Sequence, residues 1–184
     1  TLEKAQQQKV EHILRKLQLE KGQSMLDIGS GWGTLLITAA KEYGVKGLGI
    51  TLSKEQHKLS SERAKAEGVD KLIQFELLNY QDLAKRNVQF DRIVSVGMFE
   101  HVGQKNHPSY YKAVYKLLKP CGISVLHTIS GKTEQKMDAW IDKYIFPVAY
   151  LPSSSEIARA FPQYGFRLMD YENLRLNYAM TLDE

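Results

Sequence analysis

Short apolar segments alternate with segments of helical periodicity along most of this 184-residue sequence. The alternation predicts strands at residues 24–28, 45–51, 72–78, 90–96 and 122–129. It predicts helices at residues 2–18, 34–43, 54–67 and 108–118. Because strand–helix–strand units normally connect parallel strands by a right-handed crossover, this order predicts an α/β fold. We expect a doubly wound, mostly parallel sheet with helices on both faces.

The alternation stops after residue 130. Residues 131–154 are predicted to form an irregular or helical insertion, Ser155 to cap a short helix, and residues 166–174 to form a late strand. Earlier in the chain, Ser53 is a good N-cap for the helix at 54–67, with Gln56 in the capping-box position. No repeat or linker divides the chain, so residues 1–184 are expected to form one domain.

The composition excludes several classes of protein. With 43% hydrophobic and 25% charged residues, the chain has the make-up of a folded domain rather than a disordered one. Its one cysteine, Cys121, can form neither an intramolecular disulfide nor a cysteine-based metal site. We therefore expect no metal and favour a reducing compartment. No apolar run approaches the roughly 18 to 20 residues that are needed to cross a bilayer.

The charge balance is slightly basic, with 25 Lys and Arg against 21 Asp and Glu, a formal net charge of +4. The charged residues are scattered and form no block of one sign. A mildly basic surface can meet nucleic acid or anionic lipid, or it can reflect no partner at all. The charge alone leaves these alternatives open.

A glycine-rich loop follows the first predicted strand. Asp27 precedes the loop, and its glycines, Gly29, Gly31 and Gly33, follow a G-x-G-x-G spacing. This spacing is neither the dinucleotide fingerprint nor the phosphate loop of the nucleoside triphosphatases. An acid before such a loop suits S-adenosylmethionine (SAM), which carries an ammonium and a sulfonium but no phosphate. A generic tight turn between strand and helix is the alternative.

The second predicted strand lacks the acid that usually binds ribose hydroxyls in nucleotide sites. It ends at Thr51, Leu52 and Ser53, so Thr51, Ser53 or Gln56 must serve instead.

Four segments together resemble the cyclopropane-fatty-acyl-phospholipid synthases and the related mycolic acid cyclopropane synthases. They are LDIGSGWG (26–33), GITLSKEQ (49–56), FDRIVSVGMFEHVGQKN (90–106) and LLKPCGISVLHTI (117–129). WIDKYIFP (140–147) and LPS (151–153) extend the resemblance over nearly the whole chain. It implies a Rossmann-like class I SAM methyltransferase fold. It also implies that family segments before Thr1 and after Glu184 are missing from this sequence.

The resemblance implies a reaction. Family members transfer the methylene of SAM to a cis double bond of an unsaturated phospholipid acyl chain, with a bound bicarbonate ion as the base. A small-molecule N- or O-methyltransferase, and a SAM-binding fragment without activity, remain alternatives.

The resemblance also assigns residues to roles. The cofactor-binding positions are Asp27, which the loop already suggested, with Gly29 and Gly31 near the methionine part, Thr51, Leu52 and Gln56 near the ribose, and Tyr80 and Gln81 near the adenine. The catalytic positions are Glu100 and His127 as bicarbonate ligands, Ile129 as a backbone contact, and Tyr178. Aromatic faces at Phe99, Tyr144 or Phe146 could stabilise positive charge on the substrate.

The resemblance gives the basic charge a partner. We expect the anionic surface of a membrane, with the protein cytoplasmic and peripherally attached, and no role for nucleic acid. The oligomeric state stays open.

Overall fold

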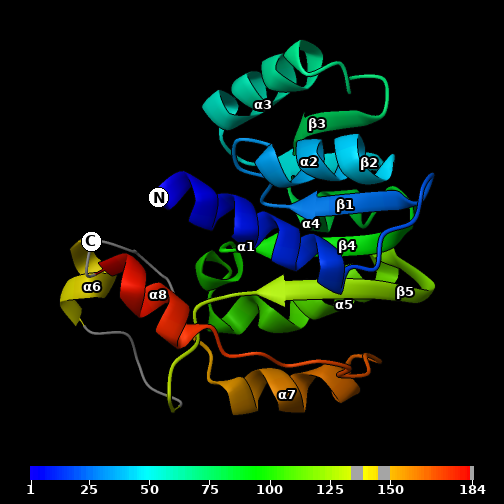
Figure 1. The fold of residues 1–184 in the computed structure, drawn as a ribbon. Coiled ribbons are helices and arrows are strands. Elements are labelled where there is room, and N and C mark those ends of the chain that lie inside the picture. Colours follow the sequence, from blue (N-terminus) through cyan, green and yellow to red (C-terminus); the bar gives the residue numbers. More distant parts are fainter. Residues whose placement is uncertain (134–138, 145–149, 183–184) are drawn as a thin grey trace.

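Five parallel strands form one sheet in the computed structural model, which describes residues 1–133, 139–144 and 150–182 (Figure 1). The strands are β1 (Ser24–Ile28), β2 (Lys46–Thr51), β3 (Ile73–Leu77), β4 (Phe90–Val96) and β5 (Leu118–His127). Their order in the sheet is β3-β2-β1-β4-β5, and each neighbouring pair is parallel. The strands β2 and β3 are therefore added on one side of β1, and β4 and β5 on the other. Ligands of open α/β sheets bind at such a switch point, here between β1 and β4.

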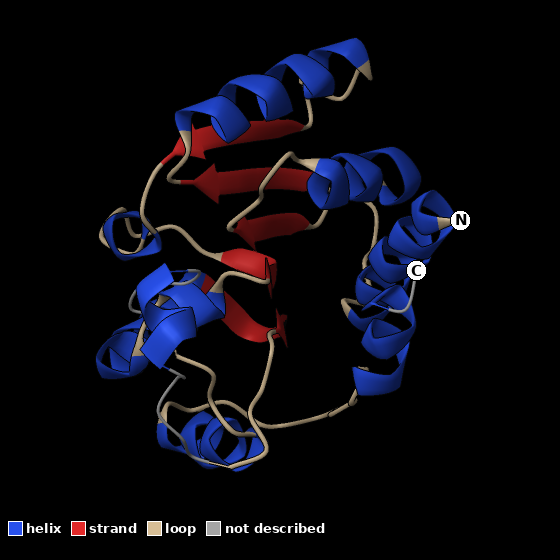
Figure 2. Cartoon of the chain, turned by 90° about the vertical axis from the view of Figure 1, so that its left-hand side faces the viewer, coloured by secondary structure: helices blue, strands red, loops and turns tan. Residues whose placement is uncertain are grey.

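Helices cover both faces of this sheet (Figure 2). They are α1 (Leu2–Lys16), α2 (Thr34–Tyr43), α3 (Lys54–Ala66), α4 (Tyr80–Leu83), α5 (His107–Leu117), α6 (Ala139–Tyr144), α7 (Ser154–Gln163) and α8 (Arg175–Leu182). Two 3₁₀ turns, η1 (Phe99–His101) and η2 (Gln104–Asn106), precede α5. The fold is thus the doubly wound α/β architecture that the sequence predicts.

The two faces of the sheet carry separate hydrophobic clusters. Along β1, Met25 packs with α1 and α2, whereas Leu26 packs with α4 and α5 on the other face. Along β4, Val94 belongs to the cluster with α1 and α2, and Ile93 belongs to the cluster with α4 and α5. Because both faces are buried, these strands read as continuous apolar runs rather than alternating ones.

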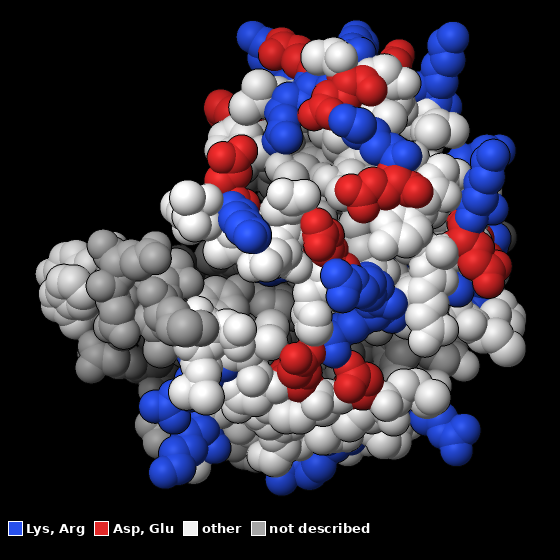
Figure 3. All heavy atoms as spheres, in the orientation of Figure 1, with Lys and Arg blue, Asp and Glu red and all other residues white. Residues whose placement is uncertain are grey.

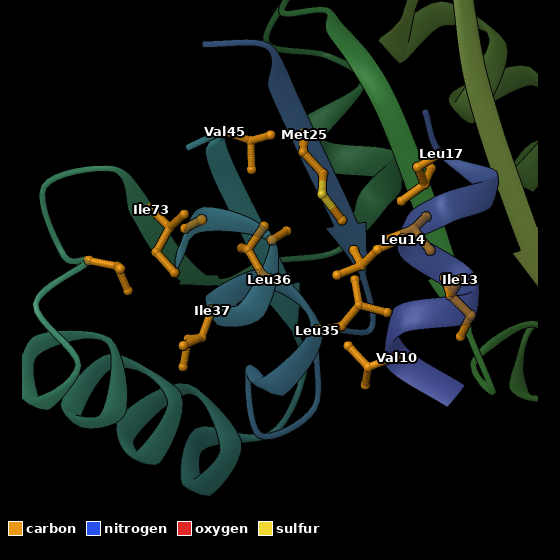
Figure 4. Close-up of a cluster of buried hydrophobic side chains, with 14 of the residues drawn as sticks. Val10, Ile13, Leu14, Leu17, Met25, Leu35, Leu36, Ile37, Val45 and Ile73 are labelled. Atoms are coloured by element: carbon orange, nitrogen blue, oxygen red, sulfur yellow. The ribbon is translucent and has the colours of Figure 1, made fainter. Parts of the chain in front are cut away.

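Helix α1 is fixed firmly to the first of these clusters. Val10 and Leu14 point from α1 toward Leu35 of α2, and Ile13 is buried in the same cluster (Figure 4). The C-terminal end of α1 is capped by Arg92 of β4, whose guanidinium donates to the carbonyl oxygens of residues 17 (2.6 Å) and 18 (3.1 Å). The buried face and this cap make α1 a rigid support for whatever contacts its exposed face.

The late strand predicted at residues 166–174 is wrong. This segment has no regular structure, and it crosses α1 instead of extending the sheet beyond β5. Its carboxylates at Asp170 and Glu172 pair with the basic side chain of Lys16 on α1. The segment was predicted to be a strand, but its two acidic side chains are held by helix α1 instead.

Several predicted boundaries also shift. The strand predicted at 122–129 starts at Leu118 and ends at His127, so Ile129 lies beyond it. The cap predicted at Ser155 is wrong: the N-cap of α7 is Ser153, which forms a complete capping box with Glu156. The sequence reasoning had also missed α4 and α8 as helices.

In the part of the chain that the structure describes, no helix is both long enough and apolar enough to span a bilayer.

Candidate functional site

The carboxyl ends of the parallel strands meet at one edge of the sheet, toward which the arrowheads point in Figure 1. The glycine loop follows β1 there, and Leu52 follows β2. Glu100 lies in η1 soon after β4, and His127 is the last residue of β5. The topology therefore brings residues from distant parts of the sequence to the same edge.

The glycine loop makes a tight turn between β1 and α2. Its first two backbone N–H groups, at Gly29 and Ser30, donate to the carbonyl oxygen of Ile50 at 2.9 and 3.0 Å. Gly29 has a φ of +80°, and a Cβ atom there would lie 2.8 Å from Cβ of Met98. Only glycine fits, since this φ is strained for other residues and the space is filled by a side chain. Gly31 also has a positive φ of +53° but faces open space.

Asp27 is a buried acid that has no partner in the part of the chain that the structure describes. Only 3% of its surface is exposed, and its carboxylate makes no hydrogen bond or ion pair with any described residue. Burial raises its pKa from 3.8 to about 7, because the charged form loses its hydration. A cation next to Asp27 would favour the ionised form, so this carboxylate fits a positively charged group of a ligand bound at the glycine loop.

The end of β2 presents a small polar network. The Thr51 hydroxyl donates to Oε1 of Gln56 (2.7 Å), and the Ser53 backbone N–H donates to the Thr51 hydroxyl (3.2 Å). Ser53 caps α3 as predicted, accepting from the backbone N–H of Gln56 (3.2 Å). The Gln56 side chain does not complete the capping box, since its Oε1 accepts from Thr51 instead. Leu52 is exposed beside this network.

Tyr80 and Gln81 lie at the start of α4, just beyond β3. The Tyr80 ring contacts the ring of Tyr110 edge-on, with centroids 5.4 Å apart, and burial raises its pKa. Gln81 is exposed, and its backbone N–H donates to Oδ1 of Asn79 (2.8 Å). Because β1, β2 and β3 are neighbours, all eight predicted cofactor-binding residues lie along three adjacent strand ends.

Glu100 is held in a buried position between two loops. It is 6% exposed, and its Oε1 accepts from the backbone N–H of Ile129 at 2.6 Å. Its carbonyl oxygen accepts from the backbone N–H of Tyr150 at 3.0 Å. Its second carboxylate oxygen, Oε2, is buried and has no hydrogen-bond partner among the described residues. A buried acid in this state keeps one hydrogen-bond acceptor unused.

His127 lies close to Glu100 and Tyr178. Its Nε2 is 3.3 Å from the Tyr178 hydroxyl, while its Nδ1 is buried without a partner among the described residues. Burial lowers the pKa of His127, with help from the positive charge of Lys9 on α1 and against the opposing charge of Glu100. Burial raises the pKa of Tyr178, and the Glu100 charge adds to this shift. Both side chains are therefore neutral near neutral pH.

The structure brings together all four residues that were predicted to be catalytic. Glu100 contacts Ile129 directly, His127 contacts Tyr178 directly, and Glu100 acts electrostatically on both His127 and Tyr178. Their side chains provide one carboxylate that accepts hydrogen bonds, one imidazole and one phenol. Such a set can accept and donate hydrogen bonds to a small polar ion or move a proton.

The aromatic residues are placed differently from one another. Phe99 is fully buried and stacks on His107 (4.2 Å between centroids), so its ring belongs to the core. Tyr144 is exposed on α6. Phe146 lies outside the described residues.

Sequence reasoning missed the residues that support Glu100 from behind. Tyr150 donates its backbone N–H to Glu100, and its hydroxyl donates to Oε1 of Glu156 (2.7 Å). Glu156 in turn accepts from the backbone N–H of Ser153 (2.7 Å). The S-x-x-E spacing of Ser153 and Glu156 was a usable signal for the capping box, but no spacing pointed from Tyr150 to Glu100.

Comparison with known proteins gives the family. The family model described as mycolic acid cyclopropane synthetase matches residues 1–184. The chain belongs to this family. It is 49% identical over 182 residues to the cyclopropane-fatty-acyl-phospholipid synthase of Escherichia coli strain K12, covering 98% of this chain and 46% of that protein. It is 34% identical over 197 residues to the cyclopropane mycolic acid synthase MmaA2 of Mycobacterium tuberculosis, covering 100% of this chain and 68% of that protein.

Solved structures of two members of this family have the same fold as this chain. The structure of MmaA2 from M. tuberculosis aligns with a TM-score of 0.91, at 34% identity, over 100% of this chain and 68% of that one. The structure of the mycolic acid cyclopropane synthase CmaA1 complexed with SAH and CTAB aligns with a TM-score of 0.90, at 30% identity and with the same coverage. The predicted family and the predicted methyltransferase fold are confirmed. The chain spans about half the length of the first curated relatives that it matches.

Proposed function

We propose that this family member is the catalytic core of an enzyme that transfers a methylene group from SAM to the cis double bond of an unsaturated phospholipid acyl chain, forming a cyclopropane ring. One observation carries the proposal: Glu100, His127 and Tyr178 gather at the sheet edge where the glycine loop also lies, and this loop is preceded by a buried acid with no partner among the described residues. The E. coli relative, which is named for this activity, supports it.

SAM fits the cofactor side of the site. The unpartnered Asp27 carboxylate suits the ammonium of SAM, and the backbone at Gly29 and Gly31 allows a ligand to approach closely. We assign Thr51, Leu52 and Gln56 to the ribose, and Tyr80 and Gln81 to the adenine. When bound, SAM supplies an activated methyl group on a sulfonium.

Bicarbonate fits the second side of the site. The buried Oε2 of Glu100 and the buried Nδ1 of His127 are two polar atoms without partners among the described residues, and a small ion with both a proton and acceptor oxygens satisfies both. Bicarbonate held there would supply the base that removes a proton from the substrate. Glu100 must accept the hydroxyl proton of the ion, since two anions do not associate without a shared proton.

The contact between His127 and Tyr178 determines which nitrogen of the imidazole carries the proton. If the Tyr178 hydroxyl donates to Nε2, then Nδ1 of the neutral imidazole carries the proton and donates into the site. Ile129 donates its backbone N–H to Glu100 in this structure, which holds the carboxylate in place. We propose that these contacts orient the base while burial around Glu100 excludes the water that would otherwise quench positive charge on the acyl chain.

We propose that residues 1–184 act as one domain that reaches its lipid at the anionic surface of a membrane, as a cytoplasmic, peripherally attached protein. The formal net charge of +4 favours such a surface. On the face seen in Figure 3, however, Lys and Arg are interspersed with Asp and Glu, so the attraction from this face is modest.

The test uses the full chain, SAM with an isotopically labelled methyl group, and vesicles of phosphatidylglycerol with cis-monounsaturated chains. We expect label in the acyl chains and a mass gain of one CH₂ per modified chain. Vesicles with saturated chains are the matched control, because they have no double bond to react. Label found only in a polar small molecule would instead indicate an N- or O-methyltransferase.

Two further measurements separate binding from chemistry. Calorimetry with SAM tests the cofactor assignment, and the absence of heat at saturating SAM would refute it. Glu100→Gln should abolish most ring formation while leaving SAM affinity nearly unchanged. Equal losses in both would place Glu100 at the cofactor instead.

A further inference from the structure

The irregular segment at residues 165–174 is fixed to α1 by charged contacts. Lys16 Nζ pairs with Oε2 of Glu172 at 2.8 Å and also pairs with Asp170. His12 Nε2 lies 2.7 Å from the same Glu172 oxygen. The two carboxylates raise the pKa of Lys16, and Lys16 and His12 lower that of Glu172, as mutual stabilisation requires. These four residues form a charged clamp between α1 and the segment that leads into α8.

One side of the clamp is rigid. Helix α1 buries Ile13 and Leu14 against the sheet, and Arg92 caps its C-terminal end. His12 and Lys16 are four residues apart on the other face of the helix, so they project together toward the segment. The clamp is therefore anchored in the core of the protein on the α1 side.

The other side of the clamp leads directly to the site. Glu172 is followed by Asn173, whose side chain accepts from the first backbone N–H of α8 (2.9 Å). One turn into α8, the Tyr178 hydroxyl reaches His127. Figure 1 shows α8 lying beside the carboxyl end of β5, on the side of α1.

The first turn of α8, whose side chains the structure describes, buries no apolar side chain. The side chains from Arg175 to Tyr178 are all exposed, including Leu176. Among the described residues, the charged contacts of the preceding segment fix the point from which α8 starts.

We propose that Lys16, assisted by His12, is a positioning residue: by holding Asp170 and Glu172 against α1, it places α8 so that Tyr178 contacts His127. The clamp also offsets positive charge on the face of α1 that includes Lys9 and adjoins His127. The inference rests on the proposed function, since it gives Tyr178 a part in the same site.

The experiment compares Lys16→Met with Arg15→Met in the full chain. Arg15 is a matched control, because it is a basic residue of the same helix whose ion pair is with Glu11 of that helix (3.6 Å). We expect Lys16→Met to lower kcat by about two- to fivefold, the upper part of the range of effects that exposed ion pairs give. The KM for SAM should stay the same, since the proposed cofactor-binding residues lie at the ends of β1, β2 and β3, whereas Tyr178 contacts the end of β5. Lys16→Arg should restore most of the turnover.

A double-variant cycle tests whether Lys16 acts through Tyr178. If it does, adding Lys16→Met to Tyr178→Phe should lower kcat little further, because the contact that Lys16 supports is already lost. If the two effects multiply independently, Lys16 does not act through Tyr178 and the proposal is wrong.

A measurement without turnover keeps this inference separate from the proposed function. The ring signals of His127 in an NMR spectrum report its contact with Tyr178. Lys16→Met should shift these signals in the same direction as Tyr178→Phe, and Arg15→Met should leave them in place. A missing shift would overturn the clamp even in an active enzyme, while a clear shift would support it even if the wild-type chain makes no cyclopropane.

Discussion

The buried Asp27 makes a quantitative prediction about stability and pH. In the folded chain its pKa is about 7, against 3.8 for an ordinary aspartate. Between these two values the folded state binds a proton that the unfolded state has lost, so stability falls as the pH rises and the loss is complete above the folded pKa. A pKa difference of about three corresponds to about 4 kcal/mol. Water that enters the site would reduce the effect, so we expect about 2 to 4 kcal/mol.

The perturbation is Asp27→Asn, which removes the titrating group and keeps its size. The free energy of unfolding of the variant minus that of the wild type should increase by about 2 to 4 kcal/mol between about pH 4 and about pH 8. Urea unfolding without SAM measures both values at each pH. Asp70→Asn is the matched control, because Asp70 is an exposed aspartate and the same charge is removed.

The same acid links SAM binding to proton release. Near pH 6, about one unit below its pKa in the free protein, Asp27 is mostly protonated, and the SAM ammonium should drive the proton off. Calorimetry in two buffers of different ionisation enthalpy should show this release for the wild type and not for Asp27→Asn. If the stability difference between variant and wild type stays constant with pH to within about 0.5 kcal/mol, Asp27 is already charged in the folded chain and the reasoning fails.

Three further predictions concern single positions. Gly29→Ala should weaken SAM binding at least tenfold by calorimetry, since its Cβ would lie 2.8 Å from Cβ of Met98 at a φ of +80°. Phe99→Ala should lower the free energy of unfolding by about 3 to 5 kcal/mol, because its ring is fully buried in the core; a loss below about 1 kcal/mol would contradict that placement. Hydrogen bonds from Ser24 (2.6 and 2.8 Å) hold the pKa of Asp91 well below its usual range, so Asp91 stabilises the fold above its unfolded pKa and this contribution is lost as the pH falls. Asp91→Asn should accordingly destabilise the chain more at neutral than at acid pH in urea unfolding, and an equal loss at both would contradict this.

The chain offers a matched control for the glycine variant. Gly22 has nearly the same φ, +85°, but a Cβ atom there would meet nothing within 4 Å. Gly22→Ala therefore carries the backbone strain without the steric clash. If it weakened SAM binding as much as Gly29→Ala does, the clash with Met98 would not be the cause.

Local sequence patterns predicted much of the site. The glycine spacing after an acid, the apolar run before Glu100 and the helix cap at Ser53 are each encoded in a short stretch of sequence, and each is found where it was expected. These patterns depend on backbone conformation and on periodicity, which neighbouring residues control. The same patterns failed at residues 166–174, because the partners of that segment are on α1, more than 150 residues earlier.

The sequence by itself determined the alternation of strands and helices up to β5, the glycine loop after β1 and, through its resemblance, the family. The tertiary structure alone decided which residues meet: the Ile129 backbone with Glu100, Tyr178 with His127, and Tyr150 behind Glu100. It also decided the raised pKa of Asp27, which comes from burial on β1 between the neighbouring strands β2 and β4. The physical reason is that hydrogen bonding and desolvation between distant segments depend on how the chain closes on itself, and no local pattern records that closure.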